Sequence, residues 1–593
     1  IIIQILRGVE IMKKLSGAEI FIESLSREQV ELVFGYPGGA VLPIFEEFRK
    51  SKIKFVMPYH EQVAIHAAGG YARSTGKAGV CVATSGPGGT NLVTGLATAN
   101  MDSIPIVAFT GQVPMSAIGT DAFQEADIRG ITAPITKHNY LVKDINDLAQ
   151  TIKEAFYIAQ TGRPGPVLID IPKDILMQTA EFNYPDKVYL PGYNPTKKGH
   201  GLQIKKAAEA INTAKTPVIY AGGGVINSNG SQELRELANK SGIPVTTTMM
   251  GLGSFDSTSP LSLGMLGLHG TTQANKAIYN ADLIIAVGAR FDNRVTGKID
   301  KFAPNAKIIH IDIDPAEIGK RLYIDIPIVG DVKFVLEELN QKINENEHPE
   351  WMQQINKWRD LHHQKAYQPK KGKLTHRQVM EEIYNVSPKN TIITTEVGQH
   401  QMWAAHYYKY TEARSFISSG GLGTMGFGFP AAIGAQLGNP DKKVIVIAGD
   451  GSFMMNMQDM ATIAKQNLPI NIAIFNNKQL GMIRQLQEVY QDKNYFSTCL
   501  RKDVSCPPDC SVGGENCPEE MIPDFVKLAE AFSNFKAIRI EKVEDIRPAI
   551  EEAVNSPKPY LLDFIMEEEE TMFPMVVDGD SLDEMLLHKE EIK

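Results

Sequence analysis

The chain of 593 residues lacks several features that would place it in a broad class of proteins. No apolar run approaches ~20 residues, so we expect no membrane-spanning helix. The 60 basic residues are outnumbered by 69 acidic ones, the net charge is −9, and no long basic run is present, so we expect no nucleic-acid partner. Cysteine is scarce, with five residues, and four of them lie between Cys499 and Cys517. This pattern does not suit a secreted disulfide scaffold, and we expect a cytoplasmic protein.

The N-terminus lacks the features of a signal peptide. Residues 1–7 are apolar, but this stretch is short and has neither a basic start nor a cleavage site of small residues. The domain pattern begins at Met12. We therefore give residues 1–11 no function; they would fit an over-extended reading of the start.

The length exceeds that of a single hydrophobic core, and two to four domains are expected. Three segments alternate short β-branched apolar runs with amphipathic helical stretches. This predicts three doubly wound, mostly parallel α/β domains at 12–182, 202–344 and 374–570. Polar linkers separate them, and the second linker is helical in character. The tail from 567 mixes acidic and apolar residues, and its composition favours a solvated end over a lid.

Two polar motifs follow neighbouring apolar runs in the third segment. Gly449-Asp450-Gly451 follows the run 444–448, Asn476-Asn477 follows the run 470–475, and residues 454–466 between them are expected to form a helix. In such β-α-β units, ligands bind outside the carboxyl ends of the strands. A carboxylate and an amide there supply oxygen ligands for Mg²⁺, which would complete its octahedral shell with water and a diphosphate.

This pair of motifs resembles the signature of thiamin diphosphate enzymes. The resemblance implies that Asp450, Asn477 and the carbonyl of Gln479 hold Mg²⁺. It also calls for a carboxyl group that exchanges a proton with the cofactor's pyrimidine, and Glu61, in His60-Glu61-Gln62, fits that group. An apolar ring beside a carboxyl raises its pKa, which suits proton exchange near neutral pH. From its position alone, Glu61 could instead complement a helix dipole or form an ion pair.

Four motifs narrow the resemblance to the catalytic subunits of the acetolactate (acetohydroxyacid) synthase family. They are Gly35-Tyr36-Pro37-Gly38-Gly39, His60-Glu61-Gln62 and the stretches 121–127 and 162–167. The similarity covers nearly the whole chain from Met12. It implies that the protein decarboxylates pyruvate on thiamin diphosphate and joins the two-carbon unit to pyruvate or 2-oxobutyrate. That reaction is the first common step of valine, leucine and isoleucine biosynthesis.

The resemblance also assigns residues. Gly35 and Pro37 lie in a turn expected to approach the pyrimidine and substrate, although a tight turn alone would explain these glycines. Gln124 and Lys137 would contribute to the binding site of the acceptor 2-oxoacid, and Arg294 would bind its carboxylate. The ordinary alternative for Arg294 is a surface ion pair. The expected cofactor residues of the third segment are Gln399, His400, Gly423, Met425, Gly449, Gly451 and Met482.

The second segment carries a pattern typical of dinucleotide binding. Glycines end two predicted strands and acids follow later ones, as a pyrophosphate and a ribose hydroxyl require. The spacing is not a strict Gly-x-Gly-x-x-Gly. The resemblance implies a structural FAD, with these expected contacts: Gly222, Gly223, Gly224, Leu266, His269, Gly288, Arg290, Asp312, Ile313, Asp331 and, from the first segment, Arg163.

The sequence departs from the family pattern at three places. Leu486 stands where most biosynthetic members carry Trp, so we expect a weaker preference for 2-oxobutyrate over pyruvate, worth ~1–3 kcal/mol. The motif around Arg294 has Asn293 where the family has Asp. A Cys-rich insertion at 499–520 contains Cys499, Cys506, Cys510 and Cys517 without a Cys-x-x-Cys, so a metal or Fe–S site, a disulfide and free thiols all stay open.

The resemblance implies further partners. The first and third segments hold opposite ends of the cofactor, and in the family they come from different chains, so a homodimer is the minimum assembly and a small regulatory subunit is expected. The main rival is an FAD-dependent oxidase of pyruvate on the same fold. Decarboxylases and flavin-free catabolic acetolactate synthases are closer rivals. A degenerate binding protein would lack Glu61, Asp450 or Asn477, and all three are present.

Overall fold

The computed structural model describes residues 13–364, 372–501, 522–568 and 570–592. These fall into two compact units, one formed by 13–72 with 77–194 and the other by 73–76 with the described residues from 195 onward. Within these ranges, no helix is both long and apolar enough to cross a bilayer. The stretch from 182 to 200 contains no helix or strand, as predicted for the first linker.

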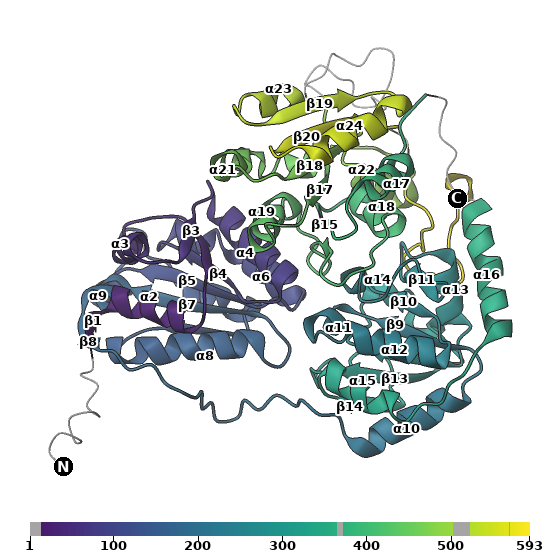
Figure 1. Cartoon of the computed structure of the whole chain (residues 1–593), viewed down its shortest axis with the longest axis horizontal. Helices are drawn as coiled ribbons and strands as arrows, with labels where there is room; N and C mark the ends of the chain where they lie inside the picture. Colours follow the sequence, from purple (N-terminus) through teal and green to yellow (C-terminus); the bar gives the residue numbers. More distant parts are fainter. Residues whose placement is uncertain (1–12, 365–371, 502–521, 569, 593) are drawn as a thin grey trace. The chain divides into compact units, whose positions relative to one another are not determined.

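The first unit is built on a parallel sheet of six strands in the order β3-β2-β4-β5-β7-β6 (Figure 1). In that order, the strands are Lys54–Val56, Leu32–Gly35, Gly79–Ala83, Ile106–Gln112, Pro166–Pro172 and His138–Leu141. A short antiparallel pair, β1 (Lys14–Ser16) and β8 (Thr179–Glu181), joins the two ends of this unit's chain.

Helices cover both faces of this sheet. One apolar core unites it with α2 (Gly17–Arg27), α3 (Leu42–Lys50), α8 (Leu148–Gln160) and α9 (Lys173–Met177). No side chain of α4 (Glu61–Thr75) or α6 (Val93–Met101) belongs to that core. These two helices contact each other through Ile65 and Gly95, and they form the other layer. α2 begins at a Ser16–Glu19 capping box, which satisfies its first N–H groups.

The second unit contains two further parallel sheets of six strands. The central sheet has the order β11-β10-β9-β12-β13-β14, which is the classic dinucleotide-binding order 3-2-1-4-5-6. Its strands are Ser262–Met265, Val245–Thr247, Pro217–Ala221, Leu283–Val287, Lys307–Asp312 and Ile326–Val329. The third sheet runs β16-β15-β17-β18-β20-β19. Its strands are Phe416–Ile417, Ile392–Thr395, Val444–Gly449, Asn471–Asn476, Tyr560–Ile565 and Lys536–Ile540.

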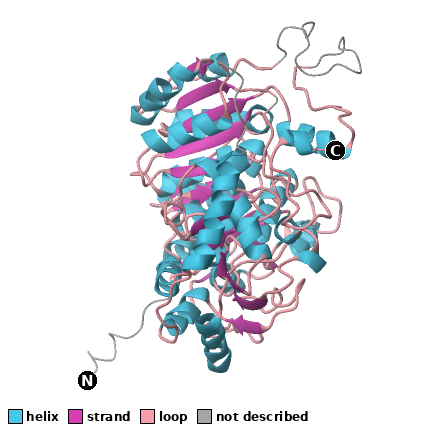
Figure 2. Cartoon of the chain, turned by 90° about the vertical axis from the view of Figure 1, so that its right-hand side faces the viewer, coloured by secondary structure: helices cyan, strands magenta, loops and turns pink. Residues whose placement is uncertain are grey.

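Alternating side chains show that these sheets are covered on both faces, and Figure 2 shows strands flanked by helices. In β9, Ile219 and Ala221 belong to the core with α10 (Gly201–Thr213), α12 (Ser231–Ser241) and α15 (Val332–Asn340). Val218 and Tyr220 belong to the core with α13 (Thr272–Tyr279) and α16 (Pro349–Gln364). A sheet buried on both faces explains why its strands appear as continuous apolar runs.

The third sheet follows the same rule. One core joins it to α17 (His376–Val386), α18 (Gln399–Tyr407) and α24 (Val543–Asn555), while α19 (Gly428–Gly438) contacts β15 and β17 outside that core. The predicted class, three doubly wound parallel α/β arrangements, is confirmed.

Two expectations are wrong. The predicted helix 454–466 is broken into α20 (Asp450–Phe453), a 3₁₀ turn and α21 (Met460–Gln466), because Asn456 leaves the helical conformation and its amide donates to the Gly426 carbonyl at 2.6 Å. The tail is not a solvated end, since Met572, Val576 and Leu582 are buried against the cores of the second unit.

Candidate active site

The first unit gathers its predicted residues at the carboxyl ends of β2 and β4, where the strand order reverses. Gly35 ends β2, and a side chain there would lie 2.3 Å from the Val82 carbonyl, so only glycine fits. Pro37 follows in the turn. Glu61 begins α4 (Glu61–Thr75), and its carboxylate accepts a hydrogen bond from Asn91 at 2.9 Å.

Three other predicted residues of this unit lie in loops and turns. Gln124 is half-buried with a positive φ of 61°, and its backbone packs on Gly86. Arg163 donates to the Ser103 hydroxyl at 2.8 Å. The Lys137 ammonium donates to the carbonyls of Ile158 and Thr161 at 2.6 and 2.8 Å, at the C-terminal end of α8. This contact explains Lys137 structurally, and its predicted role at the acceptor stays a prediction.

The predicted metal ligands of the second unit meet at the carboxyl ends of β17 and β18. Asp450 is 1% exposed, and its Oδ1 accepts from the Gly451 N–H at 2.8 Å. Its Oδ2 is buried without a hydrogen-bond partner among the described residues. Burial raises the pKa of this carboxyl to about 7, and a bound cation would favour the ionised form again.

The two asparagines after β18 have different environments. Asn476 turns back to the sheet and donates to Asp563 at 3.0 Å. Asn477 lies beside Gln479, whose N–H donates to the Asn477 Oδ1 at 3.2 Å. Asn477, the predicted ligand, therefore differs from Asn476 in its partner, and its role as a metal ligand stays a prediction.

In the part of the chain that the structure describes, several buried polar atoms without hydrogen-bond partners belong to residues that follow β15 and β18, the two neighbours of β17. The Oε1 of Gln399, the Nε2 of His400 and the Oε1 of Gln479 lack partners among the described residues. Burial lowers the pKa of His400 to about 3, so its imidazole is neutral near pH 7. A side chain at Gly449 would lie 2.9 Å from that ring, which explains this glycine. Orphaned groups of this kind fit a cation with an anionic ligand such as a diphosphate.

A turn over 423–426 carries two predicted cofactor residues, Gly423 and Met425. The buried Glu396 holds this turn: its carboxyl oxygens accept from the N–H groups of Gly426 at 2.6 Å and Phe429 at 2.8 Å. Burial raises the pKa of Glu396 to about 7. Sequence reasoning assigned Glu396 no role; its only signal was its position directly after a strand.

Gly451 and Met482 complete this set. A side chain at Gly451 would meet Leu480, the residue before α22 (Gly481–Tyr490). Met482 and Leu486 are both partly exposed on α22, one helical turn apart, so they share a face.

The predicted flavin contacts of the second unit lie at the carboxyl edge of the central sheet. Gly222, Gly223 and Gly224 connect β9 to α11 (Gly223–Asn227), and the Gly224 N–H donates to the Gly288 carbonyl at 2.9 Å. A side chain at Gly224 would lie 2.7 Å from Gly288, which has a φ of +55°. This close approach marks the switch point between β9 and β12, where dinucleotides bind in this topology.

Acids follow the next two strands. Asp312 ends β13 and is 8% exposed, with Ile313 after it. Asp331 follows β14 and caps α15 by accepting from the Lys333 N–H at 3.0 Å, and burial raises the pKa of this carboxyl.

Two turns complete the flavin set. Leu266 is buried after β11, and the carbonyl of His269 accepts from His406 at 2.6 Å. Burial lowers the pKa of His269 to about 4. After β12, the backbone carbonyl of Arg290 accepts from the Tyr220 hydroxyl at 3.1 Å, while Arg294 is exposed on α14 (Asn293–Thr296).

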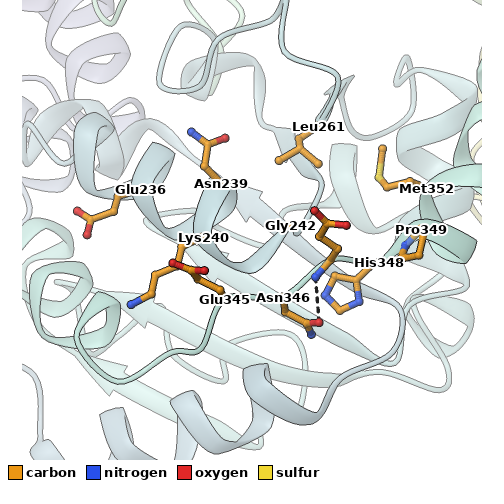
Figure 3. A pocket seen from close by; sticks show the side chains of 11 residues that line it. Glu236, Asn239, Lys240, Gly242, Leu261, Glu345, Asn346, His348, Pro349 and Met352 are labelled. Atoms are coloured by element: carbon orange, nitrogen blue, oxygen red, sulfur yellow. Dashed lines mark hydrogen bonds between the residues drawn. The ribbon is translucent and has the colours of Figure 1, made fainter.

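A separate hollow of about 870 Å³ lies in the second unit beside α12 and the start of α16 (Figure 3). Glu236, Lys240, Glu345 and His348 are among its lining residues. Leu261, just before β11, also lines it, which places it at the amino-terminal edge of the central sheet. Ligands of parallel α/β sheets bind at the opposite edge, so we do not assign this hollow to the active site.

The chain is similar to known proteins along most of its length. Three models of thiamine pyrophosphate (thiamin diphosphate) enzymes match it: the N-terminal TPP binding domain at 15–131, the central domain at 204–339 and the C-terminal TPP binding domain at 396–564. A probable acetolactate synthase large subunit of Methanococcus aeolicus is 48% identical and covers 93% of this chain and 92% of that protein. An acetolactate synthase of Mycobacterium bovis is 47% identical, covering 97% and 92%. The corresponding large subunit of Corynebacterium glutamicum is 46% identical, covering 96% and 90%.

The chain belongs to the acetolactate synthase family. The resemblance predicted from the sequence is thereby confirmed. Within this family, the three thiamin enzyme domains correspond to the three parallel sheets described above.

Only part of the Cys-rich insertion belongs to the described residues. Cys499 is half-buried, whereas Cys506, Cys510 and Cys517 lie outside the described residues. Among the described residues, no three His, Cys, Asp or Glu side chains are grouped to hold a metal. The predicted Mg²⁺ site of an acetolactate synthase is consistent with this, because only one of its protein ligands is a carboxylate.

Proposed function

We propose that the protein decarboxylates pyruvate with thiamin diphosphate and ligates the two-carbon unit to a second 2-oxoacid, pyruvate or 2-oxobutyrate. The observation that carries this proposal is the group of unpaired buried atoms around Asp450 and Asn477, at the strand ends where this family binds its diphosphate. The relatives named acetolactate synthase supply the substrate class. The product would enter branched-chain amino acid biosynthesis.

We propose separate roles for the residues that would bind the metal and for the residue that would carry the proton. Asp450, Asn477 and the Gln479 carbonyl would hold Mg²⁺, and the neutral His400 could donate to a diphosphate oxygen. Glu61 would hold and return a proton at the pyrimidine ring, with Asn91 fixing its carboxylate. When bound, thiamin diphosphate supplies the nucleophilic carbon and the electron sink that decarboxylation of a 2-oxoacid needs.

We assign the acceptor site to Gln124, Lys137 and Arg294, and the outer wall to Met482 and Leu486. Arginine suits a carboxylate because its planar fork offers two parallel N–H donors. The exposed position of Arg294 leaves its guanidinium accessible to a substrate.

A structural FAD is proposed at the central sheet. Its support is the 3-2-1-4-5-6 strand order, the Gly224–Gly288 approach and the acids Asp312 and Asp331 at the following strand ends. We further propose domains at 12–182, 202–344 and 374–570, a homodimer or larger assembly with a small regulatory subunit, and a cytoplasmic location.

The deciding experiment supplies the purified protein with equimolar pyruvate and 2-oxobutyrate, thiamin diphosphate, Mg²⁺ and FAD. We expect 2-acetolactate and 2-aceto-2-hydroxybutyrate, identified by mass spectrometry after a timed quench. Acetate or acetyl phosphate accompanied by peroxide would contradict the proposal, because the flavin would then be a redox centre. Asp450→Asn is the matched control and should lose both products, since it removes the charged metal ligand.

A further inference from the structure

Hydrogen bonds through Gln485 link Gln399, which lies beside the predicted metal site, to the C-terminal segment. Gln485, on α22, is 1% exposed. Its Nε2 donates to the Met572 carbonyl at 2.8 Å, and its Oε1 accepts from the Met572 N–H at 2.9 Å. The same Oε1 accepts from the Nε2 of Gln399 at 2.7 Å.

The direction of both side-chain amides follows from the backbone. A peptide N–H can only donate and a peptide carbonyl can only accept, so the two bonds to Met572 exclude a flipped Gln485. The oxygen of Gln485 must therefore be the atom that faces Gln399, and the NH₂ group of Gln399 must donate the hydrogen bond to it. The Oε1 of Gln399 consequently points away from Gln485, buried and without a partner among the described residues.

That oxygen borders the predicted metal ligand Asn477. A Cβ built on Gly481 would lie 2.2 Å from the Gln399 Oε1 and 2.9 Å from the Asn477 Nδ2. The oxygens of a diphosphate are hydrogen-bond acceptors, so the Gln399 oxygen would not bond to them. The Asn477 Nδ2 is a donor, and it faces away from a cation whenever the Oδ1 of the same amide faces that cation.

We infer that Gln485 is a positioning residue for the metal site. Through Gln399 it places an acceptor oxygen beside the Asn477 Nδ2, which favours the orientation of this amide in which the Oδ1 faces the cation. This inference rests on the proposed function, because the cation is the Mg²⁺ of that function. Partners of this kind, one shell outside the ligands, typically change metal affinity 10–100-fold when removed.

The test is a calorimetric titration of Mg²⁺ into the full-length protein with saturating thiamin diphosphate. We expect Gln485→Met to weaken Mg²⁺ binding about tenfold. The matched control is Gln487→Met on the same helix. Gln487 also pairs with one backbone unit through two bonds, to Phe496 at 2.9 and 3.1 Å, but on the outer side of α22. Its loss should leave the Mg²⁺ affinity unchanged.

A double-mutant cycle separates positioning from a general structural role. If Gln485 acts through Gln399, the variant Gln399→Met/Gln485→Met binds Mg²⁺ no more weakly than Gln399→Met alone. Additive losses, or an unchanged affinity in Gln485→Met, overturn the inference. If Gln485→Met does not fold, Gln399→Met carries the test, and an unchanged affinity there also overturns it. Failure of the unaltered protein to bind Mg²⁺ and thiamin diphosphate would instead contradict the proposed function.

Discussion

Leu486 and Met482 share one face of α22, whereas Gln485 between them is buried on another. The face of α22 that we propose as the wall of the acceptor site can therefore be changed without altering the hydrogen bonds to Met572. Because a leucine offers less apolar surface than the Trp that the family resemblance leads us to expect, the extra methyl group of 2-oxobutyrate would make less contact at the proposed acceptor site.

Leu486→Trp should consequently shift the products toward 2-aceto-2-hydroxybutyrate. We expect the ratio of that product to 2-acetolactate to rise about tenfold, the usual effect of one methyl or methylene contact on specificity. The measurement is the product ratio from equimolar pyruvate and 2-oxobutyrate. Ile483→Trp is the control, since Ile483 is 46% exposed on the same helix, and it should leave the ratio unchanged. Equal ratios in all three proteins would contradict the assignment of this face to the acceptor.

The sequence predicted the site residues that directly follow strands. It did not predict the buried polar residues whose hydrogen bonds keep the neighbouring turns and side chains in place. Asp450 and Asn477 stand in a recognisable spacing, and the structure brings them to neighbouring strand ends. Gln485 and Glu396 gave no comparable signal, because their partners, Met572 and Gly426, lie 87 and 30 residues away along the chain. A buried polar residue is explained only by its partner, and that partner is set by the fold.

At the scale of elements, a buried carboxyl joins two strands of the first sheet. Asp170 on β7 lies opposite Thr110 on β5, and it accepts from the Thr110 hydroxyl at 2.7 Å and the Gln112 amide at 3.0 Å. Gln112 also donates to the Ala126 carbonyl at 2.9 Å, two residues after Gln124. The pair thereby connects the sheet to the loop that carries a proposed acceptor residue.

This carboxyl should make stability depend on pH. Burial raises the pKa of Asp170 from 3.8 to about 7, so its protonated form is favoured in the folded state. The resulting stability is present at low pH and is lost as the pH rises from about 4 through about 7.

The variant Asp170→Asn cannot ionise at this position, so it should not lose this stability as the pH rises. Relative to the unaltered protein, its free energy of unfolding should rise by about 2 kcal/mol between pH 5 and pH 7.5. Urea unfolding at the two pH values measures this difference. Parallel pH profiles for the two proteins would show that Asp170 ionises normally in the folded state.

At the scale of elements, sequence patterns predicted the strands but not the helix break at Asn456 or the burial of the tail. Apolar runs predicted the strands well, because a strand buried on both faces needs no partner to be recognised. The break at Asn456 depends on a carbonyl 30 residues away, and no local propensity indicates it. The tail has acidic residues that composition assigns to solvent, yet Glu570 accepts from the buried His376 at 2.6 Å and Glu584 pairs with Lys301 at 3.0 Å.

At the scale of the whole molecule, the number of sheets and their class followed from the sequence, whereas the strand order did not. The order carries functional meaning, because the central sheet alone has the 3-2-1-4-5-6 arrangement and the other two share the order 2-1-3-4-6-5. Two sheets of one order and one sheet of the dinucleotide-binding order match the proposed division between one thiamin cofactor with two binding ends and one flavin.

The proposed homodimer can be tested by complementation. In it, each active site takes Glu61 from one chain and Asp450 from the other. Glu61→Gln and Asp450→Asn should each be inactive alone, because one removes the proton carrier and the other the charged metal ligand. A mixed dimer of the two variants contains one site with both native residues and one with neither.

Co-expression of the two variants should therefore restore activity. With random pairing, half of the dimers are mixed and each has one intact site of two, so about a quarter of the unaltered activity is expected. Differently tagged chains allow the mixed dimer to be purified and assayed for 2-acetolactate, with each single variant as the control. If the purified mixed dimer is inactive while both variants fold and assemble, the two residues serve one site from the same chain, and the shared-site proposal is wrong.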